Sequence, residues 1–224
     1  AGDIPLVTKV PAETAAPKFV RRHLSFEEAV GLSCDLVDAG YDAVVPVEVS
    51  TFWDMSIVRG AYPDRAWDAE DLQGEYASAF GGPLKARAVS LLNSVQARRF
   101  DRDPGWNADL CRAVRERVDV PVLCEGGVRE RQTCDRLLGD GDRERPPATR
   151  AADLVGMGRP FYAEPRLGAR LLGGHDVLCE SCNNCTIPQV AGEPGRCRTP
   201  SIVRERARLD EQGAYETADA GTDD

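Results

Sequence analysis

The chain has 224 residues, enough for one domain with a sizeable core but short for a complete (β/α)8 barrel, which needs about 250 residues. Its net charge of −9 argues against nucleic-acid binding, which needs a basic surface. No apolar run approaches the roughly 20 residues that span a bilayer, and no secretory signal is visible, so we expect no membrane segment. Nearly all basic residues are arginine, a bias that either a salt-loving organism or genomic base composition explains.

The first part of the chain predicts a strand, a helix and a second strand. Residues 4–10 (IPLVTKV) form a mostly apolar run that we expect to be a strand ended by Pro11. Ser25, with Glu28 three residues later, has the pattern of a capping box, which predicts a helix from there to Gly40. The β-branched run at 43–49 (AVVPVEV) predicts the second strand.

A long excursion follows at residues 51–104, rich in Asp, Arg and Pro. Within it we expect one helix, at residues 84–100. A connection of this length between strands is more typical of a functional loop or lid than of a plain connector.

Regular alternation returns after residue 104. In chain order we expect a helix at 107–118, a strand at 120–124, a turn at Gly126-Gly127, a helix at 129–138, a polar loop at 139–149, a strand at 152–157, and helices at 165–172 and 198–209. The acidic tail from Asp210 is expected to be disordered. Strands that alternate with helices predict four parallel strands with right-handed crossovers.

Two glycine-containing turns follow the last two predicted strands. Gly126 and Gly127 come after the strand at 120–124, and Gly158 and Arg159 come after the strand at 152–157. Glycines let backbone N–H groups approach phosphate oxygens closely, and arginine offers a two-pronged contact to a phosphate dianion. Taken singly, each feature is more often a plain turn or a surface charge, but their order on successive strands favours a phosphate site.

The eight cysteines fall into two groups. Four are scattered singly in apolar or helical surroundings, which is typical of buried, reduced thiols: Cys34, Cys111, Cys124 and Cys134. Four lie in one short segment: Cys179, Cys182, Cys185 and Cys197. This division predicts a reducing cytoplasm and a bound metal rather than a secreted disulfide framework. Three closely spaced cysteines with a distant fourth favour a [4Fe–4S] cluster; zinc, and idle or disulfide-bonded cysteines, are the alternatives.

Three stretches together resemble a known family: VPVLCEGGV (120–128), ADLVGMGRPFYAEP (152–165) and CESCNNC (179–185). They resemble the old yellow enzyme family of NADH:flavin oxidoreductases, and most of all its branch of 2,4-dienoyl-CoA reductase and trimethylamine dehydrogenase, which adds an iron–sulfur cluster. The resemblance extends over residues 4–198, loosely before residue 103 and closely after it.

The resemblance implies an α/β fold, the C-terminal half (about strands 5–8) of a (β/α)8 TIM barrel, followed by a cysteine-rich loop and an acidic tail. We therefore expect a partial FMN-binding barrel at 1–175, the four-cysteine segment with a closing helix at 176–209, and the tail at 210–224. The chain starts at Ala1 rather than Met, so we expect a processed start or the loss of an N-terminal part.

FMN is the cofactor that the resemblance implies, with its phosphate held by Gly126, Gly127, Gly158 and Arg159. Lys9 would lie beside the N1–C2 edge of the flavin, where a cation stabilises the anionic reduced ring. From the residues alone, Lys9 is a solvated charge on a strand.

No catalytic residue can be assigned. The family places its substrate-binding histidine pair and its tyrosine proton donor on the first half of the barrel, and neither His23 nor His175 lies in such a motif. The expected function is that of an FMN-dependent NAD(P)H oxidoreductase, either an ene-reductase or an amine dehydrogenase, acting on a small molecule. Its electrons would come from NAD(P)H or a separate electron-transfer protein. The alternative is a non-catalytic metal-binding or electron-transfer module on a half barrel, whose exposed strand edges would lead to dimers or larger homo-oligomers.

Overall fold

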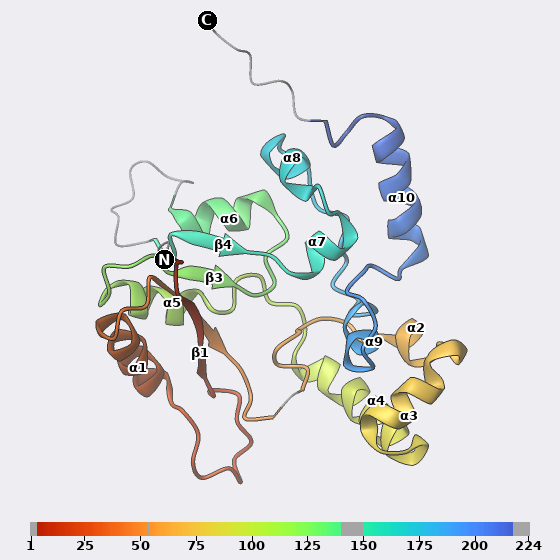
Figure 1. The fold of residues 1–224 in the computed structure, drawn as a ribbon, viewed down its shortest axis with the longest axis horizontal. Coiled ribbons are helices and arrows are strands. Elements are labelled where there is room, and N and C mark those ends of the chain that lie inside the picture. Colours follow the sequence, from red (N-terminus) through yellow and green to blue (C-terminus); the bar gives the residue numbers. More distant parts are fainter. Residues whose placement is uncertain (1–3, 53, 140–149, 217–224) are drawn as a thin grey trace, which may run out of the picture. The chain divides into compact units, whose positions relative to one another are not determined.

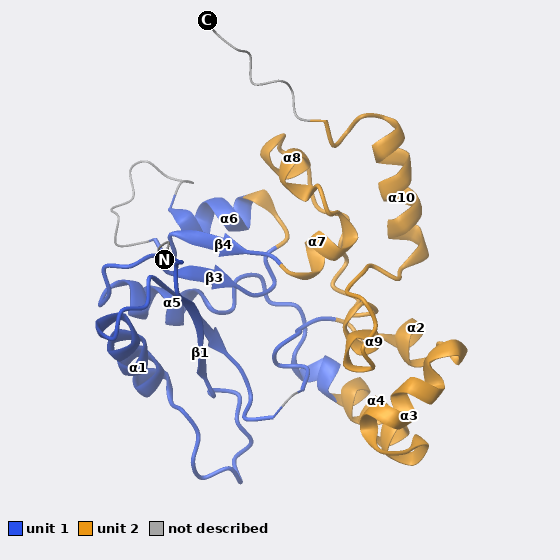
Figure 2. Cartoon of the chain, viewed as in Figure 1, with its two compact units in different colours: residues 1–60, 96–128, 132–157 blue, residues 61–95, 129–131, 158–224 orange. Residues whose placement is uncertain are grey.

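The computed structural model describes residues 4–52, 54–139 and 150–216 (Figure 1). The chain divides into two compact units (Figure 2). Unit 1 comprises residues 1–60, 96–128 and 132–157, and unit 2 comprises residues 61–95, 129–131 and 158–224. The two units are interleaved in sequence, and neither coincides with the predicted ranges 1–175, 176–209 and 210–224.

The described part of unit 1 contains four short parallel strands: β1 Val7–Ala12, β2 Ala43–Glu48, β3 Leu123–Glu125 and β4 Leu154–Gly156. β1 pairs with β2 and β3 pairs with β4, both in parallel. A parallel bridge between Val44 and Val122 joins the two pairs, with the Val44 N–H donating to the Pro121 carbonyl over 3.2 Å. The strands therefore neighbour one another in chain order, as the sequence predicted, and the half-barrel interpretation stays a prediction.

Three helices belong mainly to unit 1: α1 Phe26–Asp38, α5 Ala108–Arg115 and α6 Arg131–Leu138. The predicted capping box of α1 is confirmed, since Ser25 and Glu28 exchange side chain to backbone hydrogen bonds at its start. α1 contacts β1 and β2, whereas α5 contacts β2 and β3. The core of unit 1 lies in this helix–strand contact, because residues 44, 45 and 47 of β2 are buried, as expected for a parallel strand covered on both sides.

Unit 2 is helical in its described part. Its elements are α2 Asp64–Trp67, the 3-10 turn η1 Glu70–Leu72, α3 Gln73–Phe80, most of α4 Pro83–Arg99, α7 Arg159–Ala163, α8 Leu167–Leu172, α9 Thr186–Val190 and α10 Pro200–Glu211. Trp67 and Tyr76 are buried with Ile187 of α9 in one apolar cluster. Residues 61–86 thereby pack against α9, the helix that directly follows the first three cysteines of the motif.

Several predicted boundaries differ from the structure. Pro11 does not end β1, which continues to Ala12 with Pro11 aligned to Val47. β1 has one paired neighbour among the described strands, so a residue without an N–H fits its other edge. Residues 51–104 contain α2, η1 and α3 in addition to the predicted helix, because their apolar side chains find partners in unit 2.

The C-terminal prediction is also revised. α10 extends beyond Asp210 to Glu211, and Tyr215 in the following turn is buried, so this part of the expected disordered tail is ordered. The rest of that tail, residues 217–224, and positions 140–149 of the predicted polar loop lie outside the described residues. Within the described ranges, no helix is long and apolar enough to cross a membrane.

Candidate functional site

The first three cysteines of the motif lie in a turn of unit 2 that leads into α9. We call residues 179–185 the cysteine loop. Three polar contacts to residues 61–66 hold it. The Ser181 carbonyl accepts from the Ala61 N–H over 3.0 Å, and the Asn183 side chain donates to the Ala61 carbonyl over 2.9 Å. Asn184 accepts from the Ala66 N–H over 3.1 Å. The cysteine loop is therefore fixed by its non-cysteine side chains and backbone, which leaves the thiols to other partners.

The backbone on either side of Cys182 is left-handed. Ser181 has φ of 56° and Asn183 has φ of 61°, and both residues are buried. Asparagine tolerates this conformation, but for serine it costs about 1 kcal/mol or more. Such strain persists where the surrounding contacts impose it and is concentrated at ligand sites. The two left-handed residues lie between successive cysteines, which supports a ligand-binding role for this turn.

Burial is the main influence on the pKa of three thiols of the motif, those of Cys179, Cys185 and Cys197. Burial raises the pKa of Cys185 to about 12; the Arg159 charge opposes this shift, and Cys179, Cys182 and Cys197 add to it. Burial likewise raises the pKa values of Cys179 and Cys197. A metal bound here would have to displace thiol protons. In the part of the chain that the structure describes, no three His, Cys, Asp or Glu side chains are gathered into a metal-binding group.

Arg159 begins α7 and its side chain lies at the cysteine loop. Its guanidinium donates to the Asn183 side chain, two residues before Cys185. Burial lowers the pKa of Arg159, and three of the cysteines act in the opposite direction. Arg159 thus supplies a positive charge beside the thiols. Its expected contact with the phosphate of a flavin stays a prediction.

The turn at Gly126 and Gly127 requires glycine for a packing reason. Their φ values are 114° and 65°, a region that other residues rarely adopt. A Cβ on Gly127 would lie 2.3 Å from the Asp103 carbonyl oxygen, and one on Gly126 would lie 2.9 Å from the Trp106 ring. One side of the turn is therefore filled by residues 103–107. Gly158 differs, because a Cβ there would meet nothing within 4 Å.

Lys9 makes an ion pair with Glu125, the last residue of β3. This partner was not predicted, and the Lys9 side chain remains 55% exposed beside it. Asn107, which is fully buried, ties the ends of two strands together next to this pair. Its amide donates to the Glu125 carbonyl over 2.8 Å, and its oxygen accepts from the Glu48 N–H over 2.7 Å. The C-terminal ends of β2 and β3 are thus fixed beside Lys9. Whether a flavin lies against it stays a prediction.

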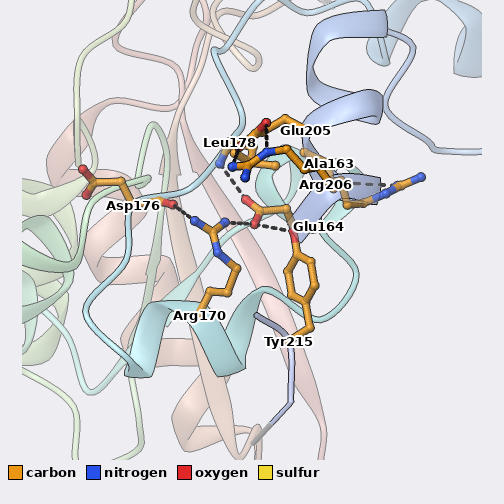
Figure 3. Close-up of polar contacts among 9 residues, drawn as sticks. Ala163, Glu164, Arg170, Asp176, Leu178, Glu205, Arg206 and Tyr215 are labelled. Carbon is orange, nitrogen blue, oxygen red and sulfur yellow. Dashed lines mark hydrogen bonds and ion pairs between the residues drawn. The ribbon is translucent and has the colours of Figure 1, made fainter. Parts of the chain in front are cut away.

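A buried ionic network supports the start of the cysteine segment (Figure 3). Glu164 is fully buried and pairs with Arg170 of α8. Its other oxygen accepts from the Leu178 N–H over 2.6 Å, directly before the first cysteine of the motif. Arg170 also donates to the Asp176 carbonyl over 3.1 Å, and Tyr215 donates to Glu164 over 3.0 Å. A buried carboxylate with this many partners holds residues 176–178 in one conformation.

Sequence reasoning missed the side chains that hold the site: Glu164, Arg170, Asn183, Thr199 and Tyr215. One of them carried a usable signal, since Thr199 directly before Pro200 is a typical helix start. The others hydrogen-bond to residues distant in sequence, which no local pattern reveals.

Comparison with known proteins gives one relevant similarity. Over 103 residues, 46% of this chain and 14% of the other protein, the chain is 24% identical to a protein named NADH oxidase from Thermoanaerobacter brockii. No protein-family model matches the chain, and no solved structure matches it. The chain is therefore distantly similar to one stretch of a protein that is named as an oxidase.

Proposed function

We propose that the chain is part of an FMN-dependent NAD(P)H oxidoreductase of the old yellow enzyme type, with a [4Fe–4S] cluster on Cys179, Cys182, Cys185 and Cys197. The observation that carries the proposal is the spacing of the four cysteines, the first three of which lie in one turn held by hydrogen bonds to residues 61–66. Four soft sulfur donors fit an iron–sulfur cluster by their chemistry, and a nearby cation compensates its negative charge. The distant relationship to an NADH oxidase supports the redox assignment.

The proposed flavin site rests on the two turns that follow β3 and β4. Gly158 leaves open space at the start of α7, which fits the close approach of a phosphate to the backbone. At Gly126 and Gly127 the Cβ side is occupied, so a phosphate would have to meet the opposite side of that turn. To lie against the flavin edge, the Lys9 ammonium group would have to interact with both the flavin and Glu125, or its ion pair with Glu125 would have to break.

When bound, FMN would accept a hydride from NAD(P)H and the cluster would pass electrons singly, so that two-electron and one-electron chemistry meet in one protein. The chain's own residues would hold these groups. The cysteines would bind iron as thiolates after losing their protons, while Asn183 and Glu164 keep the cysteine loop in place.

The reaction partners follow from the same proposal. The substrate would be an electron-poor alkene or an amine, and a separate electron-transfer protein would serve as the other redox partner. The remaining barrel strands would come from a further segment or a second chain, the cellular location would be the cytoplasm, and the assembly could include more than one copy.

The test is the metal content of the full chain, produced and purified anaerobically with iron supplied. We expect a brown protein with about four irons and matching acid-labile sulfide per chain. Cys185→Ser should lose most of the iron, whereas Cys134→Ser, a matched change at a buried cysteine of unit 1, should keep it. Zinc without iron would contradict the cluster, and iron without retained FMN would favour a metal-binding or electron-transfer module.

A further inference from the structure

Helix α4 exposes large apolar side chains at helical spacing. In unit 2 its solvent-facing stripe, which we call the α4 face, consists of Leu84, Ala88, Leu91, Leu92 and Val95. Leu84 is 83% exposed and Leu91 is 68% exposed. Because residues at i, i+4, i+7 and i+11 share one side of a helix, these side chains form one apolar surface. Contiguous apolar surface, unlike scattered single residues, indicates an interaction site.

The opposite side of α4 is fixed against the rest of unit 2. Ala86 is buried in the apolar cluster that contains Trp67. The hydroxyl groups of Ser90 and Tyr62 are hydrogen-bonded over 2.7 Å, and Asn93 is buried. The helix therefore turns small and polar residues inward and its leucines outward. It cannot rotate to bury the leucines without breaking these contacts.

Charges of opposite sign adjoin the α4 face. Lys85 and Arg87 lie on α4, and no acidic residue occurs in that helix. Residues 64–75, which pack beside it, carry one basic residue and five exposed carboxylates: Asp64, Asp68, Glu70, Asp71 and Glu75. Within the described residues, neither cation of α4 nor any of these carboxylates makes an ion pair. These charges therefore remain available to a partner.

Two hollows indent this surface. One, of about 560 Å³, is lined by Asp68 and Glu70 from one segment and by Leu84 and Arg87 from α4. The other, of about 530 Å³, is lined by Leu84, Arg87 and Leu91. Side chains of another protein can fill such hollows as anchors. A bilayer fits less well, because the carboxylates beside α4 would be repelled by anionic headgroups.

We propose that the α4 face binds a second copy of this chain about a twofold axis. A twofold interface uses the same patch on both copies, so the patch must be complementary to itself. An axis through the first hollow would exchange its two linings and place Arg87 of each copy against Asp68 and Glu70 of the other. A contact of α4 with itself would instead bring cations together. The inference does not depend on the flavin or the cluster proposed above.

The first experiment measures the dimer dissociation constant of the full chain by analytical ultracentrifugation. Leu91→Asp introduces a charge into the apolar stripe and should weaken the dimer at least about tenfold, since burying a leucine contributes about 1.5–3 kcal/mol. The matched control is Leu172→Asp on α8, which changes a leucine that is 79% exposed and lies outside the α4 face. The control should associate like wild type.

The second experiment tests the contact between copies by charge reversal. Arg87→Glu, and separately the double variant Asp68→Lys with Glu70→Lys, should each weaken self-association about tenfold, because like charges would meet. When the two variants are mixed in equal amounts, both contacts of the mixed dimer again join opposite charges, so association should return to the wild-type level. A folding defect in either variant cannot produce this restoration.

A wild-type chain that remains monomeric at every concentration measured would overturn the inference. A dimer that Leu91→Asp leaves intact, or a mixture of the reversed variants that does not associate, would also overturn it. Binding of the monomer to phosphatidylserine vesicles, lost in Leu91→Asp, would overturn it in favour of a membrane contact. Iron and FMN content test the proposed function separately, so the two can fail independently.

Discussion

Glu164 and Tyr215 are hydrogen-bonded in the interior of unit 2, although 51 positions separate them in the sequence. Glu164 has no exposed surface and Tyr215 is 5% exposed. Because Glu164 also holds Leu178 and Arg170, the last described turn of the chain is coupled to the segment that introduces the cysteines. The C-terminal residues thus contribute to the site through a buried carboxylate rather than through a local motif.

Removing the Tyr215 hydroxyl should destabilise unit 2. Tyr215→Phe takes a hydrogen bond from a buried carboxylate, and bonds to charged groups contribute about 1.5–3 kcal/mol. We expect the free energy of unfolding in urea to fall by about that amount. Tyr41→Phe is the control, since the Tyr41 hydroxyl has no hydrogen-bond partner among the described residues. Equal, small effects of both substitutions would show that the Glu164 contact carries no stability.

Two of the five tyrosines should ionise at a higher pH than a tyrosine in an unfolded chain. Burial raises the pKa values of Tyr76 and Tyr215 to about 12 each, whereas an unfolded tyrosine has a pKa of about 10. A raised pKa means that the folded state favours the protonated phenol. The resulting stability is complete below pH 10 and is lost as the pH rises through about 12. Tyrosinate absorbance should show a late component that shrinks in Tyr76→Phe and Tyr215→Phe. A single transition of all five tyrosines near pH 10 in folded protein would contradict this.

The two glycine turns should respond differently to alanine. Gly127→Ala places a Cβ 2.3 Å from a backbone oxygen at a positive φ, so we expect a loss of at least about 1–2 kcal/mol in unfolding free energy. Gly158→Ala meets no atom and should change stability by less than about 0.5 kcal/mol.

Gly158→Ala also tests the phosphate proposal. In a protein that carries flavin, Gly158→Ala should weaken FMN and leave riboflavin binding unchanged, because riboflavin lacks the phosphate. Equal losses for both ligands would place the phosphate elsewhere.

Asp153 should contribute to acid sensitivity. Burial opposes its ionisation, but the Val122 N–H and the Arg115 charge outweigh burial and lower its pKa. A lowered pKa gives stability that is present above the unfolded value of about 3.9 and is lost as the pH falls through the folded value. Asp153→Asn cannot accept at both oxygens, so we expect it to be about 1–2 kcal/mol less stable at neutral pH. In urea unfolding, the difference in unfolding free energy between Asp153→Asn and wild type should shrink below pH 4. A difference that stays constant with pH would rule out the Asp153 charge as the source of the lost stability.

The sequence by itself determined the local elements of unit 1. Ser25 and Glu28 predicted the start of α1, and the strands around Val45, Val122 and Leu154 were found where apolar runs predicted them. These features could be predicted because capping and alternation of apolar residues depend on neighbours within a few positions. The grouping of Cys179, Cys182, Cys185 and Cys197 was visible for the same reason.

Only the tertiary structure decided what surrounds those cysteines. Arg159 was expected at a phosphate, yet its guanidinium donates to Asn183, and Thr199, to which the sequence assigned no role, has its hydroxyl at Cys182. The extra helices in residues 51–104 likewise depend on burial against Ile187, far along the chain. Each of these outcomes depends on which buried polar or apolar group is nearest after folding. Tertiary packing decides which partner that is, and the periodicity of apolar residues in the sequence does not encode it.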